Sequence, residues 1–348
     1  MPDDLKTKYV FLDTEVFRGE VFDYQSAALE RLAELAESEH VSIVLTSITI
    51  NEVKSNILDA LAEAIPALRK FRSRARILRN LSDTFKNAFH ESIKLEKTSP
   101  ILIEQFEAYC KRVDAEILPI EDISIETIFE KYFNATPPFG KGEKKAEFPD
   151  AFVIATLRNW CDNTGDKLYV ISNDSDIVSA CEEIETLIPL RELAEFLDIV
   201  SAYLEKKRYD IAEQVLKACS PEIEARIREA FLDLGFYLDE LNGEVSAIEV
   251  ASLNILRSDI IDVDDQHATY SLLVEVGFLA DVSYATSFVN GLYLDEVEEE
   301  IERTEQLKVE VIIAIDLKNP DDYELQEVNL KRETIVLDSW HGEAWPYK

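Results

Sequence analysis

A short apolar run, Tyr9-Val10-Phe11-Leu12, stops at the polar pair Asp13-Thr14. Two further runs of the same kind cover residues 41–45 and 168–172, and each is followed by polar residues. Short apolar runs bounded in this way are typical of buried parallel strands. Segments with helical apolar spacing, such as residues 25–38, lie between them. This alternation predicts an α/β fold, with a parallel sheet flanked by helices on both faces.

The apolar pattern changes after about residue 195. Long stretches of near-alternating residues then predict about four antiparallel strands, at 246–263, 268–284, 306–317 and 325–337. We therefore expect a C-terminal α+β domain of mainly antiparallel strands. The predicted organisation is an α/β domain over 1–195 with a helical insertion over about 66–133, a helical connector over 196–240, and an acidic domain over 241–348.

Composition excludes several protein classes. The chain has 348 residues, of which 47% are hydrophobic, and this fraction excludes a disordered chain. No apolar stretch is long enough for a membrane span, and the first residues lack the features of a secretion signal, so we expect a cytoplasmic protein with no membrane partner. Its four cysteines form no CxxC pair, which argues against structural zinc and a disulfide framework.

Charge is distributed unevenly along the chain. It holds 70 acidic and 36 basic residues, for a net charge of -34, and 36 of the acids lie in residues 191–348 with only 14 bases. A surface so acidic repels nucleic acid, so we expect the C-terminal domain to contact protein. The C-terminal domain could contact a second copy of the chain, another protein, or the basic segment of its own N-terminal domain.

That basic segment is residues 69–79, which carry six Lys or Arg residues and no acid. Arg72, Arg76 and Arg79 share a helical face, so they could contact phosphates, although a solvated helix face explains the same spacing. Three further basic residues, Lys141, Lys144 and Lys145, occupy a predicted loop just before Asp150, where they could cover a bound phosphate.

Acids fall where predicted strands end or helices begin. Asp13 follows the first strand, Asp174 and Asp176 follow the third, Glu52 lies just beyond the second, and Asp150 opens a helix. Ligand sites of open α/β sheets lie outside the carboxyl ends of the strands, so these acids could converge on one cleft. Their mutual repulsion would be relieved by Mg²⁺ or Mn²⁺, which prefer oxygen ligands. Such a site supports phosphodiester hydrolysis by a metal-activated water.

These acids also have purely structural explanations. Asp13 could simply cap a turn at the end of its strand. Glu52 could close a capping box that begins at Thr49. Asp150 could be an acid favoured by the helix dipole, and Asp174 and Asp176 could be ordinary turn residues. Glu147 lies three residues before Asp150 and could share its helical face as a further ligand.

Taken in order, these motifs resemble those of the PIN domain, a metal-dependent ribonuclease fold, over roughly residues 8 to 190. The segments that carry the resemblance are Phe11-Leu12-Asp13-Thr14, Asn51-Glu52-Val53, Phe148-Pro149-Asp150-Ala151 and Ser172-Asn173-Asp174-Ser175-Asp176. The starting motif over 13–18 and the segment 144–151 are similar to a PIN subfamily of unknown function that has an extra C-terminal domain. The chain departs from many PIN domains in having Glu15 rather than Asn after Asp-Thr.

The resemblance implies a nuclease that acts on RNA or single-stranded DNA. It assigns catalysis to Asp13, Glu52, Asp150 and Asp174, and metal binding to these four together with Asp176 and Glu147. Thr14 and Ser172 would orient carboxylates or water. PIN-like nucleases often act as toxins or in defence, which is an expectation for the family only.

Two other functions compete with the nuclease. An inactive PIN-like module could serve for binding or as a scaffold, although such a module has no physical reason to keep clustered acids. A phosphatase of the haloacid dehalogenase type would need Asp-x-Asp after the first strand, where this chain has Asp13-Thr14-Glu15.

Overall fold

The computed structural model of the protein describes residues 5–80, 94–121, 123–139, 147–240, 242–289 and 292–338. The chain divides into two compact units, Met1–Tyr203 and Leu204–Lys348. The sequence prediction instead placed boundaries after residues 195 and 240. A single helix of 40 residues, α9 (Leu193–Leu232), contributes residues to both units.

The first unit is built on a five-stranded sheet in the order β3-β2-β1-β4-β5, in which all neighbouring strands are parallel. The strands are β1 (Tyr9–Leu12), β2 (Ser42–Thr46), β3 (Glu116–Leu118), β4 (Leu168–Ile171) and β5 (Leu187–Leu190). The predicted parallel sheet is confirmed, and its three predicted strands are β1, β2 and β4. Sequence analysis missed the edge strands β3 and β5, which are short and only partly buried.

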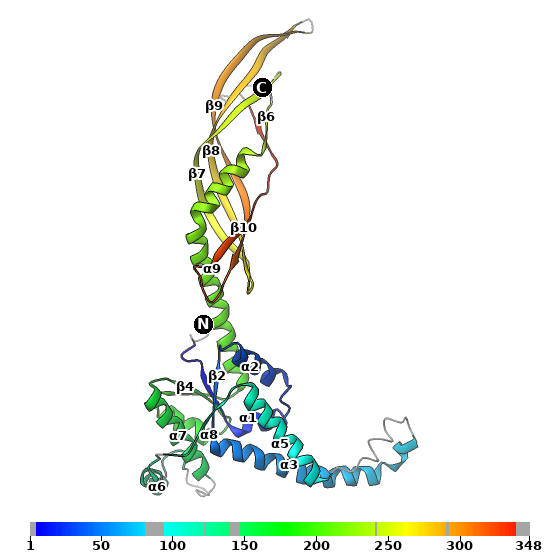
Figure 1. Cartoon of the computed structure of the whole chain (residues 1–348), viewed down its shortest axis with the longest axis vertical. Helices are drawn as coiled ribbons and strands as arrows, with labels where there is room; N and C mark the ends of the chain where they lie inside the picture. Colours follow the sequence, from blue (N-terminus) through cyan, green and yellow to red (C-terminus); the bar gives the residue numbers. More distant parts are fainter. Residues whose placement is uncertain are drawn as a thin grey trace, which may run out of the picture. The chain divides into compact units, whose positions relative to one another are not determined.

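Helices of the first unit follow the strands, and Figure 1 shows α3 and α5 side by side. They are α1 (Thr14–Gly19), α2 (Ala27–Glu37), α3 (Ser47–Arg74), α5 (Leu95–Arg112), α6 (Ile125–Asn134), α7 (Phe148–Thr164) and α8 (Ser175–Glu182), with a short 3-10 helix, η1 (Arg76–Asn80). A proline inside a helix often kinks or breaks it, but α3 continues through Pro66, with Ile57 and Ile65 buried. The predicted helical insertion also contains β3.

The order of the strands places the site. Because β1 pairs with β2 on one side and β4 on the other, the chain reverses its direction of winding at β1. Strand β4 runs beside β1 to its end, where Leu12 is opposite Ile171 and the Asp13 amide donates to the Ile171 carbonyl at 3.0 Å. In open α/β sheets such a switch point forms the ligand crevice.

In the second unit, an antiparallel sheet has the strand order β10-β9-β8-β7. Its strands are β7 (Glu244–Val263), β8 (His267–Val289), β9 (Leu292–Ile315) and β10 (Tyr323–Leu330), and a separate parallel pair joins β6 (Gly235–Leu238) to β11 (Thr334–Leu337). The predicted antiparallel C-terminal domain is confirmed. The gap expected between residues 284 and 306 is wrong, because β8 and β9 run on as one long hairpin.

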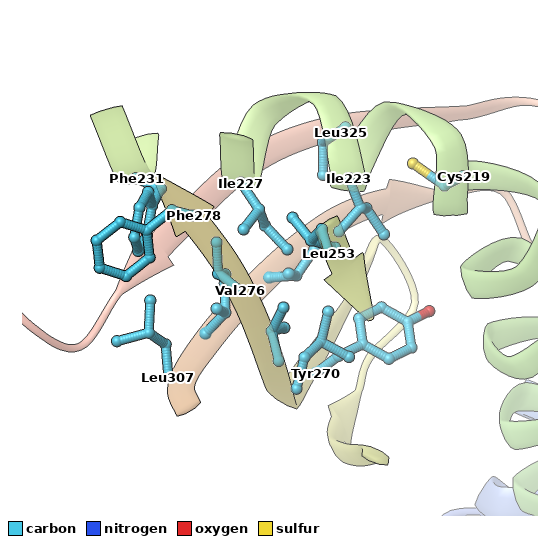
Figure 2. Close-up of a cluster of buried hydrophobic side chains, with 14 of the residues drawn as sticks. Cys219, Ile223, Ile227, Phe231, Leu253, Tyr270, Val276, Phe278, Leu307 and Leu325 are labelled. Atoms are coloured by element: carbon cyan, nitrogen blue, oxygen red, sulfur yellow. The ribbon is translucent and has the colours of Figure 1, made fainter. Parts of the chain in front are cut away.

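One side of α9 covers one face of this sheet. Cys219, Ile223, Ile227 and Phe231 recur every four residues along the helix, and Figure 2 shows them facing side chains such as Phe278 of β8. This spacing keeps all four on one side of a helix with 3.6 residues per turn. Residues 211–231, which the sequence suggested as a connector, therefore supply part of the core of the second unit.

Strand β7 does not alternate as the sequence suggested. Its pairing with β8 shifts four times, once in every five residues, between Val245 and Asp262. Each extra residue is a β-bulge, which raises the local twist and hinders pairing with another chain. Because β7 is an edge strand, these bulges explain how a strand of 20 residues stays unpaired on its outer side.

Within the described residues, no helix has the length and apolar character needed to cross a membrane. All four cysteines are buried and carry free thiols.

Candidate active site

Asp13 lies at the switch point of the sheet and is held by two hydrogen bonds. It caps the N-terminus of α1, where its Oδ1 accepts from the Thr14 amide at 2.7 Å. Its Oδ2 accepts from the Ser172 hydroxyl, at the end of β4, at 2.6 Å. Asp13 and Ser172 are both buried. The carboxylate is thus fixed in orientation between the two central strands.

Ser172 also connects Asp13 to the next acid of the site. Its Oγ accepts from the Asp174 amide at 3.1 Å. The Asp174 carboxylate caps α8 by accepting from the amides of Asp176 at 2.7 Å and Ile177 at 3.4 Å. Asp174 therefore has a structural role as the N-cap of α8, in line with its interpretation as a turn residue. It also lies at the carboxyl end of β4.

Glu52 reaches the site from the second turn of α3. Thr14 donates its hydroxyl to Glu52 Oε2 at 3.0 Å, which joins α1 to α3. The capping residue of α3 is Thr46, whose Oγ1 accepts from the Thr49 amide at 3.1 Å. A capping box from Thr49 to Glu52 is therefore wrong, because both residues lie inside the helix.

Asp150 lies in the first turn of α7, after Pro149. Its pKa is raised to about 7, mainly by burial and in addition by the charges of Asp13, Glu52, Asp174 and Asp176. Burial likewise raises the pKa of Asp13 to about 6, against the lowering effect of its hydrogen bonds from Ser172 and Thr14. The charges of four other acids, from three further stretches of the chain, therefore act on Asp150.

Glu147 and two of the basic residues can also be located in the structure. Glu147 directly precedes α7 as its N-cap residue and makes no side-chain cap. Arg72 lies 20 residues beyond Glu52 on the same helix, which at 1.5 Å per residue corresponds to about 30 Å. Arg76, in η1, is farther along the chain and exposed. The two arginines therefore do not line the carboxylate cleft. The side chain of Arg79 and all of Lys141, Lys144 and Lys145 fall outside the described residues.

The acids of the cleft suit a hard divalent cation in their chemistry. Every one of them offers carboxylate oxygens, the ligands that Mg²⁺ and Mn²⁺ prefer. Burial is the main cause of the raised pKa values of Asp13 and Asp150, and neighbouring acids add to the rise, chiefly at Asp150, where a cation would relieve their repulsion. Among the residues that the structure describes, no three of the His, Cys, Asp or Glu side chains already stand close enough together to hold a metal ion.

Ser172 is the one buried hydroxyl that touches both Asp13 and the Asp174 amide. We expect Ser172→Ala to lower the free energy of unfolding by about 1–3 kcal/mol, because two polar groups lose their partner. The pKa of Asp13 should rise above about 6, because a hydrogen bond that favours the charged form is lost. Thermal unfolding and an NMR titration measure the two effects. The exposed Ser179→Ala on α8 is the control, and equal stability of the two variants would contradict the expectation.

Sequence analysis missed a group of aromatic residues beside α7. Phe129, Tyr132 and Phe133 of α6 lie against one another, and the rings of Phe129 and Tyr132 also pack against Phe148. Phe148 begins the helix that carries Asp150. The available signal was the spacing of Ile125, Phe129 and Phe133, which places three apolar side chains on one side of a ten-residue helix.

Comparison with known proteins agrees with this geometry. Residues 10–177, which include Asp13, Glu52, Asp150 and Asp174, match the family defined by the PIN domain. No curated protein and no solved structure gives a significant match. PIN domains are in general metal-dependent nucleases. Residues 10–177 of the chain are thus identified as a PIN domain.

Proposed function

We propose that the protein is a divalent-metal-dependent nuclease that hydrolyses phosphodiester bonds of single-stranded RNA. The observation that carries the proposal is the effect of the charges of Asp13, Glu52, Asp174 and Asp176 on the pKa of Asp150, together with the place of Asp13 and Asp174 at the carboxyl ends of β1 and β4. Perturbed carboxylates gathered at a switch point of an α/β sheet are typical of a functional site. Their oxygens match a metal cofactor, for which Mg²⁺ and Mn²⁺ are the candidates.

The acids and the hydroxyl groups of the site would have different roles. Asp13, Glu52, Asp150 and Asp174 would hold the cation, which when bound stabilises charge on the phosphate and makes water a better nucleophile. Ser172 and Thr14 fix the orientation of Asp13 and Glu52 through their hydroxyl groups. These hydrogen bonds limit how far Asp13 and Glu52 must reorganise when a cation and substrate bind.

Two alternatives are less well supported by the site. In an inactive scaffold, the clustered charges would only destabilise the fold, since part of the rise in the Asp150 pKa comes from neighbouring acids. A phosphatase of the haloacid dehalogenase type needs a second Asp two residues after Asp13. That position is Glu15, which is half exposed and pairs with Arg18 at 2.9 Å.

Cleavage of a defined substrate tests the proposal. End-labelled single-stranded RNA is incubated with the full-length chain in Mg²⁺, in Mn²⁺, and in excess chelator, beside single-stranded DNA and duplex RNA. We expect cleavage of the single-stranded RNA with either metal and none with chelator. Cleavage that continues in chelator, or no cleavage with either metal, would contradict a metal-dependent nuclease.

Arg72 and Arg76 could extend the substrate contact beyond the cleft, since the segment that contains them has no acid. Replacing both with Gln should weaken binding of RNA and reduce the slope of log K against log salt. The expected reduction is about 0.7 for each phosphate contact that is lost. Binding measured between low and moderate salt gives the slope. The matched control is the pair Arg226→Gln and Arg257→Gln, two exposed residues of the acidic unit. If the slope does not change when Arg72 and Arg76 are replaced, these arginines do not contact phosphates and only form a solvated helix face.

The acidic second unit is proposed to bind protein. Its outer sheet face carries carboxylates directly opposite one another, such as Asp281 and Glu300. Like charges in this position repel each other and any nucleic-acid backbone. A second copy of the chain or another protein with a basic surface fits this face better than RNA.

A further inference from the structure

An exposed ion pair lies on the helix that begins after Asp13. Arg18 of α1 donates from Nη1 to Glu15 Oε1 at 2.9 Å, and the two side chains keep 63% and 50% of their surface accessible. Exposed pairs of this kind contribute little to stability. The fold therefore does not depend on this pair, and both groups are open to contact with a ligand.

The Arg18 guanidinium lies over the first turn of α1. Side chains of a helix lean towards its N-terminus, so they cover the turn before their own Cα. The contact with Glu15, three residues earlier, shows that Arg18 follows this rule. Asp13 is the N-cap of the same turn, and the charge of Glu15 contributes to the rise in the pKa of Asp13. The guanidinium is thus paired with a carboxylate that acts on a central acid of the cleft.

The side of α1 that carries Arg18 also faces Glu52. Thr14 and Arg18 are four residues apart, which places them on the same side of the helix. Thr14 donates its hydroxyl to Glu52 at 3.0 Å, so this side is directed towards α3. Arg18 begins one turn, or about 5.4 Å, farther along and leans back over the turn that holds Thr14. Both relations place Arg18 beside the acids Asp13 and Glu52.

Most N–H donors of Arg18 are available to a second partner. A guanidinium has several donors, and among the described residues the hydrogen bond to Glu15 uses Nη1 alone. Arg112 shows the opposite case, since its Nε, Nη1 and Nη2 all donate to Glu30 or Glu37. The planar fork of an arginine matches two oxygens of a phosphate. Arg18 can therefore bind a phosphate through its remaining donors, whereas Arg112 is already engaged.

We propose that Arg18 binds the phosphate next to the one that is cleaved, and that it exchanges Glu15 for this phosphate when RNA binds. The inference rests on the proposed nuclease function and identifies the residue that holds the strand beside the cleft. The acids of the cleft repel a strand of phosphates, so a cation close to them favours its binding. Cleavage itself brings a neighbouring phosphate of the same strand to this place, so no additional ligand has to be assumed.

Glu15 would compete with the phosphate for Arg18. In the absence of RNA it holds the guanidinium over the first turn of α1. Its carboxylate is already half exposed, so its release into water costs little. Removal of this carboxylate should therefore strengthen the binding of RNA, provided that Arg18 is present.

A double-mutant cycle between Arg18 and single phosphates tests the contact. Full-length protein with Asp150→Asn, which is expected to prevent cleavage, is titrated in Mg²⁺ with a short single-stranded RNA whose cleavage site has been mapped with the wild-type chain. Copies of this RNA carry one uncharged methylphosphonate in place of a phosphate at successive positions. In the protein that keeps Arg18, we expect binding to weaken about 10-fold at one position next to the cleaved bond. With Arg18→Gln, the intact RNA should bind about 10-fold more weakly, and the same methylphosphonate should have little further effect.

Three variants separate phosphate binding from other roles. Arg18→Gln should reduce the slope of log K against log salt by about 0.7, the value for one phosphate contact. Arg18→Lys keeps the charge but lacks the fork, so it should retain the slope and recover only part of the affinity. Glu15→Gln should strengthen binding of the intact RNA about 2- to 5-fold, and this gain should shrink when Arg18 is also replaced.

The matched control is Arg31→Gln. Arg31 forms the same kind of ion pair on α2, with Glu34 at 2.8 Å, and the two side chains are exposed to a similar extent. This variant should leave both the affinity and the slope unchanged. In the chain that keeps Asp150, Arg18→Gln should raise the KM for RNA with little change in kcat, because a neighbouring phosphate is bound equally before and during the reaction.

Full affinity in Arg18→Gln, or losses that add at every methylphosphonate position, would overturn the contact. A fall in kcat with unchanged KM would overturn it as well, because it would show that Arg18 only supports the position of Asp13. An equal loss of affinity in Arg31→Gln would reduce the effect to net charge. A chain that cleaves RNA but shows no coupling between Arg18 and one phosphate overturns this inference alone. A chain that does not cleave RNA overturns the proposed function and the contact that rests on it.

Discussion

Replacing Asp150 by Asn is expected to reduce turnover of single-stranded RNA by at least about 100-fold in Mg²⁺. The change keeps the shape of the side chain but removes a negative charge from the centre of the acidic cleft. Asp150 is the residue whose pKa responds to Asp13, Glu52, Asp174 and Asp176 together. A loss of this size at a position between so many acids would come from weaker metal binding and a misplaced phosphate.

The same variant should be more stable than the wild type when metal is removed. Burial and the neighbouring acids raise the pKa of Asp150 to about 7, so its ionised form destabilises the folded state at and above that pH. Asn cannot ionise, and we expect the free energy of unfolding at pH 8 to rise by about 1–2 kcal/mol. Thermal unfolding in excess chelator measures this gain.

Asp162→Asn is the matched control, because Asp162 is an exposed acid on the same helix that pairs with Arg158 at 3.6 Å. It should leave turnover and stability nearly unchanged. A variant at position 150 that keeps wild-type turnover would remove Asp150 from the site. A large loss of both turnover and stability would show instead that the carboxylate is needed for folding.

Removing metal should make the stability of the protein depend strongly on pH. Asp13 and Asp150 have folded-state pKa values of about 6 and about 7, both above the usual value for Asp. Between pH 5 and those values the folded protein keeps protons that the unfolded chain has released. Stability is therefore greatest at low pH, falls as pH rises through 6 and 7, and becomes constant above about pH 8.

For two such groups we expect a fall of about 2–4 kcal/mol in the free energy of unfolding between pH 5 and pH 8. Added Mg²⁺ or Mn²⁺ should restore most of this loss at pH 8 and little at pH 5, because only ionised carboxylates bind the cation. Denaturant unfolding at the two pH values, with and without metal, measures both effects.

The control for this prediction is Asp150→Asn, in which the pH dependence should be smaller and the stabilisation by metal weaker. Addition of NaCl at the same ionic strength excludes simple screening. A metal-free protein whose stability rises between pH 5 and pH 8 would contradict the pKa assignments. Equal stabilisation by metal at both pH values would argue against binding through these acids.

Local sequence was sufficient for the central strands and for the acids that follow them. The runs that became β1 and β4 are wholly apolar and end in polar residues, because both faces of a central parallel strand are buried while its carboxyl end opens onto a crevice. Asp13 and Asp174 are caps of the helices that follow, so backbone geometry alone places them at the strand ends. These features depend on neighbouring residues alone and not on distant parts of the chain.

Long-range packing determined what local patterns could not. The edge strand β3 has only three residues, too few for a recognisable sequence pattern, and it is defined by its pairing with β2. In β7, a bulge every five residues interrupts the alternation of apolar and polar side chains that identifies a strand in a sequence. Arg72 was predicted to contact phosphates, and it lies 20 residues beyond Glu52 in α3, which at 1.5 Å per residue corresponds to about 30 Å.

The sequence by itself determined the parallel sheet, the acids at its carboxyl edge and the antiparallel character of the C-terminal unit, because each follows from periodicity over a few residues. Only the tertiary structure decided which acid each of Ser172 and Thr14 contacts, that α9 completes the second core, and that Phe129 of α6 packs on Phe148 of α7. These contacts join segments far apart in the chain, and no local pattern encodes the distance at which such segments meet.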